Sequence, residues 1–322
     1  MSHPLGNNNT NHKYWSHLVV PDFSINRFVT VPENAGYVLL SDDGVSWSTQ
    51  STIGVYSYIG LCWSPDLGIL LAPINGYAKG MYSTDGGLTW TSTTITGSAD
   101  WLCTCWSKER GIFVVMSGTE VAQSYDGINW TSVTAATAVN NYVEWVAVFG
   151  RFVSTKWSSV DGITWDQITS GDSQAYGGWD GSFSTSNNTF YQITTNGPSG
   201  TKLWSTTDGQ SWDAVRVIET TSSINYYNHM AYSPSLDMIA IAGGTSLPQA
   251  GHILTSTDEF VTTATFSTGY RLTDITWSEP EGLFVATTQA INWVWKSTDG
   301  VSWSTQSITT IANYAQQIVY AN

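Results

Sequence analysis

The stretch Ser83-Thr84-Asp85-Gly86-Gly87-Leu88-Thr89-Trp90 recurs, mostly in a form one residue shorter, along the whole chain. An Asp followed by Gly favours a tight turn, because the carboxylate accepts backbone N–H groups two or three residues on and Gly adopts a positive φ without steric cost. The Trp then buries a large apolar ring against the sheet. We interpret each copy as a structural hairpin turn between two strands, here called a box turn. The seven box-turn aspartates are Asp43, Asp85, Asp126, Asp161, Asp208, Asp258 and Asp299, and the copy at Asp258 lacks both the Gly and the Trp.

A second signature precedes the box turns. Trp63-Ser64 is followed by a polar turn and a β-prone run, and Trp106-Ser107 and Trp277-Ser278 begin matching stretches. This pattern predicts two strands, and the box turn adds two more. Successive box aspartates are 35 to 50 residues apart, which is the period of a four-stranded propeller blade. The sequence therefore predicts an all-β fold, a seven-bladed β-propeller of four-stranded antiparallel blades, with a polar N-terminal arm at 1–13 and a single propeller domain at 14–322.

Two segments could complete the ring. His17-Leu18-Val19-Val20 and Gln317-Ile318-Val319-Tyr320 both resemble the first strand of a blade. One of them is expected to join the blade of Asp43, and the pattern does not select between them.

Composition limits the classes of function. The net charge is −14, with only 11 Lys and Arg residues, which argues against nucleic acid or an anionic membrane as partner. Cys62, Cys103 and Cys105 have no disulfide or metal-ligand spacing and are expected to be buried. No segment has the pattern of a classical signal peptide or a membrane-spanning helix. No phosphate loop or metal-binding His pair occurs, so we expect no cofactor and no metal.

The box turns resemble the Asp-box, or BNR, repeat, Ser-x-Asp-x-Gly-x-Thr-Trp, which Ser83 to Trp90 matches in full. The resemblance covers about residues 14–322. It implies a propeller rather than an activity, since members include sialidases, endoglucanases, sortilin-type receptors and a photosystem assembly factor. The chain also resembles, in composition alone, phage and viral structural proteins. Sialidases need three arginines around the substrate, and Arg27, Arg110 and Arg151 do not occupy such positions, so that activity is rejected.

Aromatic residues recur near the start of each repeat's first strand, beside polar residues. A flat ring next to an amide or carboxylate is typical of a glycan site; the alternative is that the rings wedge blade against blade. Two of them, Trp179 and Trp293, have no counterpart in the other repeats. The candidate ligand-binding residues are Tyr58, Trp101, Tyr142, Trp179, Asp180, Tyr226, Tyr227, Tyr270, Trp293 and Tyr314.

Alignment of the repeats also places Asp180, His229 and Asp274 at equivalent positions of three adjacent blades, near the channel, and strand alternation places Glu144 on the channel side. Two carboxylates flanking a His suit general acid–base chemistry on a glycoside or ester. The alternative is a polar channel lining satisfied by solvent.

These features favour a non-enzymatic binding or structural propeller on a virion or extracellular surface, recognising carbohydrate in receptor binding or adhesion. The expected partners are a glycan or cell-surface receptor, and other structural subunits. One alternative is a scaffold or decoration subunit that docks on a capsid or tail. The other is a glycoside hydrolase that uses Asp180 and Asp274.

Overall fold

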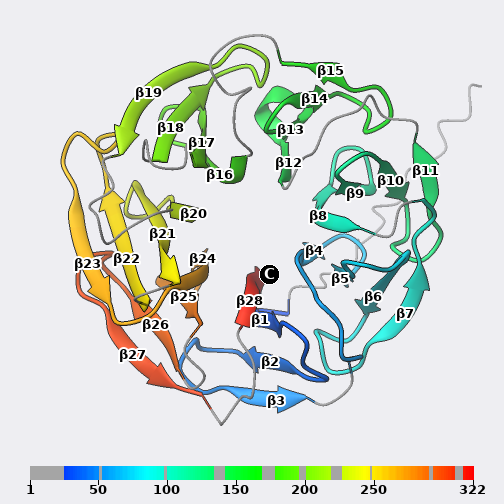
Figure 1. Cartoon of the computed structure of the whole chain (residues 1–322), viewed down its shortest axis with the longest axis horizontal. Helices are drawn as coiled ribbons and strands as arrows, with labels where there is room; N and C mark the ends of the chain where they lie inside the picture. The colour runs from blue at the N-terminus through cyan, green and yellow to red at the C-terminus, as the bar shows by residue number, and fades with distance from the viewer. Residues whose placement is uncertain are drawn as a thin grey trace, which may run out of the picture.

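Each sequence repeat forms one four-stranded antiparallel sheet, and the seven sheets surround a central channel as the blades of a propeller (Figure 1). The predicted all-β, seven-bladed fold is thereby confirmed. The structure is a computed structural model that describes residues 25–50, 53–97, 100–133, 142–168, 178–195, 201–218, 227–246, 249–289, 293–308 and 315–322. The arm at 1–13 and the segment His17–Val20 lie outside these residues. No helix in the described ranges is long and apolar enough to cross a membrane.

The strands of each blade are given in order from the channel outward, and the blades are numbered in the order of their box turns along the chain. Blade 1 comprises β28 (Ala315–Ala321), β1 (Arg27–Pro32), β2 (Val38–Ser41) and β3 (Ser48–Gln50). Blade 2 comprises β4 (Cys62–Ser64), β5 (Ile69–Pro73), β6 (Lys79–Ser83) and β7 (Thr91–Thr94), and blade 3 comprises β8 (Trp101–Ser107), β9 (Ile112–Ser117), β10 (Val121–Ser124) and β11 (Thr131–Val133).

Blade 4 comprises β12 (Val143–Val146), β13 (Arg151–Ser154), β14 (Trp157–Ser159) and β15 (Asp166–Gln167), with the short helix η1 (Ala147–Phe149) between its first two strands. Blade 5 comprises β16 (Gly178–Ser184), β17 (Thr189–Thr195), β18 (Thr201–Thr206) and β19 (Asp213–Ile218). Blade 6 comprises β20 (Tyr227–Ser233), β21 (Met238–Ser246), β22 (Gln249–Ser256) and β23 (Ala264–Thr268), and blade 7 comprises β24 (Leu272–Ser278), β25 (Leu283–Thr288), β26 (Trp293–Ser297) and β27 (Ser304–Ser307).

The C-terminal strand closes the ring. β28 pairs antiparallel with β1, with Val319 opposite Val29, and so supplies the innermost strand of blade 1. The indole N–H of Trp63 in blade 2 donates to the carbonyl oxygen of Asn322 at 2.9 Å. The end of the chain is therefore held by the blades on both sides of the closure. Of the two candidate segments, the one around Ile318 takes the closing position.

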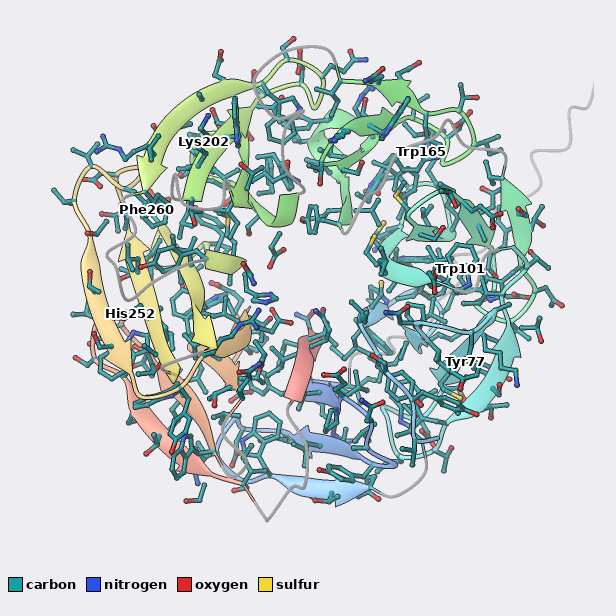
Figure 2. The ribbon with its side chains drawn as sticks, viewed as in Figure 1. Tyr77, Trp101, Trp165, Lys202, His252 and Phe260 are labelled. Carbon is teal, nitrogen blue, oxygen red and sulfur yellow. The ribbon has the colours of Figure 1, made fainter. Side chains whose placement is uncertain are left out.

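The core lies between the blades. The second strands are buried along their whole length, as in β9 and β25, whereas the outermost strand β7 is mostly exposed. The described residues form seven clusters of buried apolar side chains, each shared by two neighbouring blades; one joins Val29 of blade 1 to Leu70 and Trp90 of blade 2. The side chains drawn in Figure 2 fill the ring and leave its centre largely open. Burial between blades, rather than within one blade, thus holds the ring together.

The box turns have the hydrogen bonds that the sequence predicts. Asp126 Oδ1 accepts the backbone N–H of Asn129 at 2.7 Å and the hydroxyl of Ser124 at 3.0 Å. Gly127 has a φ of 69°, and its carbonyl accepts the indole N–H of the buried Trp130 at 3.2 Å. The turn is therefore satisfied within itself and connects the third and fourth strands of the blade.

The box turn of blade 6 keeps this geometry without the usual residues. Asp258 accepts the hydroxyl of Ser256 at 2.7 Å and the N–H of Thr262 at 2.9 Å. Glu259 and Phe260 occupy the left-handed positions, with φ of 58° and 62°, where a side chain costs about 1–2 kcal/mol. Phe260 is buried in the core between blades 5 and 6. Apolar burial thus offsets the strain and substitutes for the missing Trp.

Candidate functional site

Three candidate site residues come from the innermost strands of three adjacent blades. Asp180 lies on β16, His229 on β20 and Asp274 on β24. The pairing of each of these strands with its neighbour shifts register just before the residue in question. A β-bulge of this kind rotates the residues that follow and re-aims their side chains. The repeated bulge therefore turns all three side chains toward the same part of the channel.

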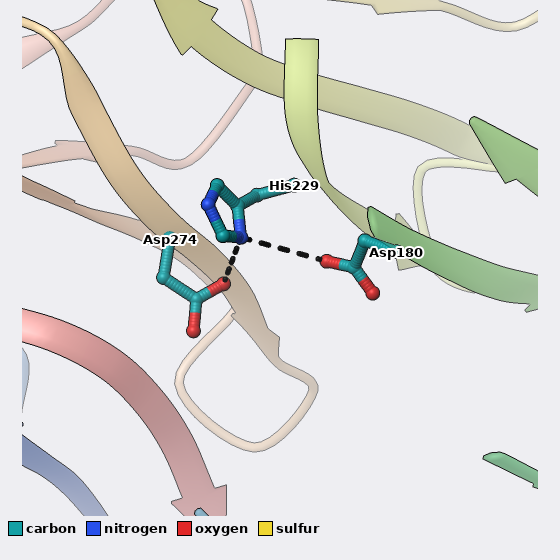
Figure 3. A group of neighbouring side chains, drawn as sticks. All are labelled: Asp180, His229 and Asp274. Carbon is teal, nitrogen blue, oxygen red and sulfur yellow. Dashed lines mark ion pairs between the residues drawn. The ribbon is translucent and has the colours of Figure 1, made fainter. Parts of the chain in front are cut away.

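His229 lies between the two carboxylates (Figure 3). Its Nδ1 is 3.4 Å from Asp274 Oδ1 and 3.9 Å from Asp180 Oδ2. The side chains of Asp180, His229 and Asp274 are 18%, 15% and 9% exposed. The structure thus brings together the three residues that the repeat alignment placed near one another.

Each of the two carboxylates also accepts a backbone hydrogen bond from the next blade. Asp180 Oδ1 accepts the N–H of Gly181 at 2.8 Å, and Oδ2 accepts the N–H of Met230 in blade 6 at 2.9 Å. Asp274 Oδ1 accepts the N–H of Ile275 at 2.7 Å, and Oδ2 accepts the N–H of Ile318 in the closing strand at 2.8 Å. These bonds fix both carboxylates in orientation and connect the innermost strands of successive blades.

The cluster gathers several acidic groups, and their burial opposes ionisation. Burial, together with the charge of Asp274, raises the pKa of Asp180 well above its usual range, although its backbone hydrogen bonds oppose the shift. Glu144 on β12 is half-buried, and its desolvation raises its pKa from 4.5 to about 7. The hydroxyl of Tyr142 donates to Glu144 and lies 3.1 Å from the carbonyl oxygen of Gly181. The acidic wall of the channel therefore extends from blade 4 to blade 7.

These residues line a cavity of about 480 Å³. Glu144, Asp180, His229 and Asp274 form its polar side, and no Lys or Arg is among the described residues that line it. The rest of the wall is largely apolar and includes the three buried cysteines. Burial raises the pKa of the Cys62 thiol to about 12, so these thiols stay protonated near neutral pH.

Three of the predicted aromatic residues are core residues. Tyr58, Trp101 and Tyr227 are buried, with exposures of 0%, 0% and 1%, and each belongs to an apolar cluster shared by two blades. Figure 2 shows Trp101 within the wall of the ring. A ring without exposed surface cannot stack on a sugar. This position matches the alternative interpretation, in which the rings wedge blade against blade.

The other predicted aromatics are placed differently. Tyr142 lines the channel cavity. Tyr270, between β23 and β24, and Trp293 on β26 are half-buried, and their rings pack edge to face at 5.7 Å. Trp179 lies in β16. Tyr226 and Tyr314 lie outside the described residues.

Sequence reasoning placed Glu144 on the channel side but did not include it among the candidate ligand-binding residues, although Tyr142, two positions away, was included. On one strand this spacing puts both side chains on one face, and that was the available signal. The bulges had no signal in the sequence, because they depend on how each strand pairs with its neighbour.

Comparison with known proteins shows the fold and not a family. No protein-family model matches this sequence, and no curated protein matches it. Similar solved structures include a protein from Lactobacillus plantarum, with a TM-score of 0.65 at 10% identity over 90% of this chain and 98% of that chain. They also include the GH74 xyloglucanase from Xanthomonas campestris, with a TM-score of 0.62 at 12% identity over 88% and 55%. A third is YCF48 bound to D1 peptide, with a TM-score of 0.58 at 13% identity over 83% and 87%.

Proposed function

We propose that this chain is a non-enzymatic binding propeller of a virion or extracellular surface, and that it recognises carbohydrate in its central channel. The observation that supports this most is the cavity of about 480 Å³, whose polar side presents Glu144, Asp180, His229 and Asp274 opposite a largely apolar wall. Carboxylates accept hydrogen bonds from sugar hydroxyls, and apolar surface covers the C–H face of the ring. A polar side facing an apolar side suits a small polyhydroxylated ligand.

The acidic lining of the cavity limits the class of sugar that we propose as ligand. Three carboxyl groups and no Lys or Arg line its described part, so the cavity offers an anionic ligand no positively charged partner. The proposed ligand is therefore a neutral or amino sugar rather than a sialic acid. This agrees with the rejection of a sialidase on the positions of the arginines.

The contacts of the carboxylates favour binding over hydrolysis. A glycosidase needs one carboxyl that gives up its proton to the leaving group and a second that attacks or activates water. In Asp180 and Asp274, both oxygens already accept backbone N–H groups. Among the similar folds, one is named as a xyloglucanase and one as a peptide complex, so the fold alone does not choose between these roles.

A glycan array tests the proposal. The wild type is expected to bind neutral or amino sugars, and His229→Gln and Glu144→Gln are expected to lose at least tenfold in affinity. Gln306→Ala on the exposed strand β27 is the matched control and should bind as the wild type does. Failure of the wild type to bind any glycan would refute the proposal. Unchanged binding by both channel variants would move the site out of the channel.

A second candidate is the scaffold or decoration subunit. One observation favours it: the residue after the left-handed positions of the box turn is an exposed aliphatic side chain in six repeats. These residues are 36–63% exposed and are Val45, Leu88, Ile128, Ile163, Val261 and Val301. Because all box turns connect third to fourth strands, the six side chains lie on one face of the ring, where a neighbouring subunit could cover them.

Sedimentation velocity tests this second role. The wild type should form concentration-dependent assemblies, and replacement of Ile128, Ile163 and Val301 by Ser should abolish them without changing the far-ultraviolet circular dichroism. Deletion of residues 1–13 should weaken assembly if the arm takes part. A wild type that stays monomeric at all concentrations would count against this candidate.

A further inference from the structure

We propose that Asp180, His229 and Asp274 form a binding site for one divalent cation, with Zn²⁺ the best fit. Each residue offers one ligand atom toward the same point, and the three atoms lie within 4.8 Å of one another. They come from three separate blades, so the site exists only in the closed ring. This inference does not depend on sugar binding.

The spacing fits the coordination of zinc. Zinc bonds to imidazole nitrogen and carboxylate oxygen are about 2.0–2.2 Å long, so neighbouring ligand atoms of a tetrahedral site stand about 3.3–3.6 Å apart. His229 Nδ1 is 3.4 Å from Asp274 Oδ1 and 3.9 Å from Asp180 Oδ2. The ligand oxygens of Asp180 and Asp274 lie within 4.8 Å of each other, so Asp180 would move toward both other ligands to complete three corners of the tetrahedron. The fourth corner faces the cavity and would take water.

The acidic residues of the channel wall favour the binding of a cation. Asp274 is buried and Asp180 is half-buried beside Glu144, and the described lining of the cavity contains no Lys or Arg to balance their charge. Buried carboxylates without a counter-ion are costly, and a bound divalent ion removes that cost. The only basic group of the described lining is His229, and its Nδ1 faces both carboxylates.

The surroundings also hold the ligands in place. The backbone N–H groups of Gly181 and Met230 orient the carboxylate of Asp180, and those of Ile275 and Ile318 orient Asp274. Hydrogen bonds of this kind to metal-binding carboxylates fix their direction and raise affinity. One imidazole and two carboxylates form a set that suits Zn²⁺ or Mn²⁺ better than Ca²⁺, which prefers oxygen ligands alone.

Titration calorimetry with ZnCl₂ tests the proposal on the full chain after removal of metal with EDTA. The expected result is one Zn²⁺ per chain in the wild type. His229→Ala and His229→Asn should bind Zn²⁺ at least tenfold more weakly, because each removes the imidazole ligand. The fold should be kept, because the contacts of this imidazole among the described residues are those to Asp180 and Asp274. His252→Ala is the matched control, because His252 lies on β22 of the same blade (Figure 2) and contacts Ser267 rather than the channel acids.

Cobalt absorption identifies the ligands independently of affinity. Co²⁺ in this site should give visible d–d bands without the near-ultraviolet band of a cobalt–thiolate bond, because the three cysteines are not ligands. Circular dichroism confirms that each variant is folded. Absence of stoichiometric metal binding, wild-type affinity in both His229 variants, or a thiolate band would each overturn the proposal. Metal binding without sugar binding would leave it standing and would reject only the proposed carbohydrate function.

Discussion

The two halves of the channel wall use the same innermost strands with different chemistry. In blades 2 and 3 the sulfur of Cys62 receives the backbone N–H of Trp106 from the next blade, and burial raises the pKa of the thiol to about 12. In blades 5 and 7, Asp180 and Asp274 receive the N–H groups of Met230 and Ile318 from the next blade. A neutral thiol can therefore make the contact between blades. The carboxylates bring charge that this contact does not require, which is why we place function in the acidic half.

The largest expected effect is that of Asp274→Ala. It leaves the N–H groups of Ile275 and Ile318 without an acceptor in the buried wall, and unsatisfied buried groups cost about 1–3 kcal/mol each. We expect the free energy of unfolding in urea to fall by about 3 kcal/mol. Cys105→Ala in the thiol half is the comparison and should cost about 1 kcal/mol. If both variants lost the same free energy of unfolding, the acidic half and the thiol half of the channel wall would not differ in the way proposed.

The second prediction concerns Glu144, whose pKa is raised from 4.5 to about 7 in the folded state by burial. Below pH 4.5 the carboxyl is protonated in both states. Between pH 4.5 and 7 the unfolded chain ionises while the folded chain stays protonated, so stability falls as pH rises and levels off above pH 7. The contribution is roughly 3 kcal/mol.

Glu144→Gln should remove this decline. The measurement is the free energy of unfolding of wild type and variant at several pH values from 4 to 8, and the difference between them should change with pH over that range. Parallel profiles would show that Glu144 does not titrate as proposed.

The box-turn aspartates provide the opposite case, because hydrogen bonds within the turn lower their pKa values and hold them in the charged form. The backbone N–H of Ser46 is the main cause that lowers the pKa of Asp43 to about 2. This contribution is present above about pH 4 and is lost as pH falls through 2. Asp43→Ala should therefore cost about 1 kcal/mol at pH 7, as for the loss of a helix cap, and less at pH 2. A cost that grows toward low pH would contradict this assignment.

The smallest effect is expected from Cys62→Ser. The hydroxyl can accept the same N–H of Trp106, so stability should change by less than about 1 kcal/mol. Metal binding should stay at the wild-type level, because the three proposed ligands all lie in the acidic half. Loss of metal binding would mean that the ion takes a ligand from the thiol half.

Sequence reasoning could find the candidate triad because Asp180, His229 and Asp274 occupy equivalent places in the repeats, and equivalent places in a closed ring face one centre. It could not tell which of the candidate aromatic side chains are buried in the core and which keep exposed surface. Tyr58 and Tyr270 both stand near the start of a blade, yet only Tyr58 is fully buried. That difference depends on which side chains the neighbouring blade places against each ring.

The sequence by itself determined the blades. A box turn such as that at Asp126 is made by hydrogen bonds between residues at most three or four positions apart, so its motif is enough to specify it. The tertiary structure decided how the blades meet. Three contacts join residues that are distant in the chain. They are the pairing of β28 with β1, the hydrogen bond from Trp63 to Asn322 and the hydrogen bond from Ile318 to Asp274. Such contacts depend on the closure of the whole ring, because only there do these buried groups find their partners.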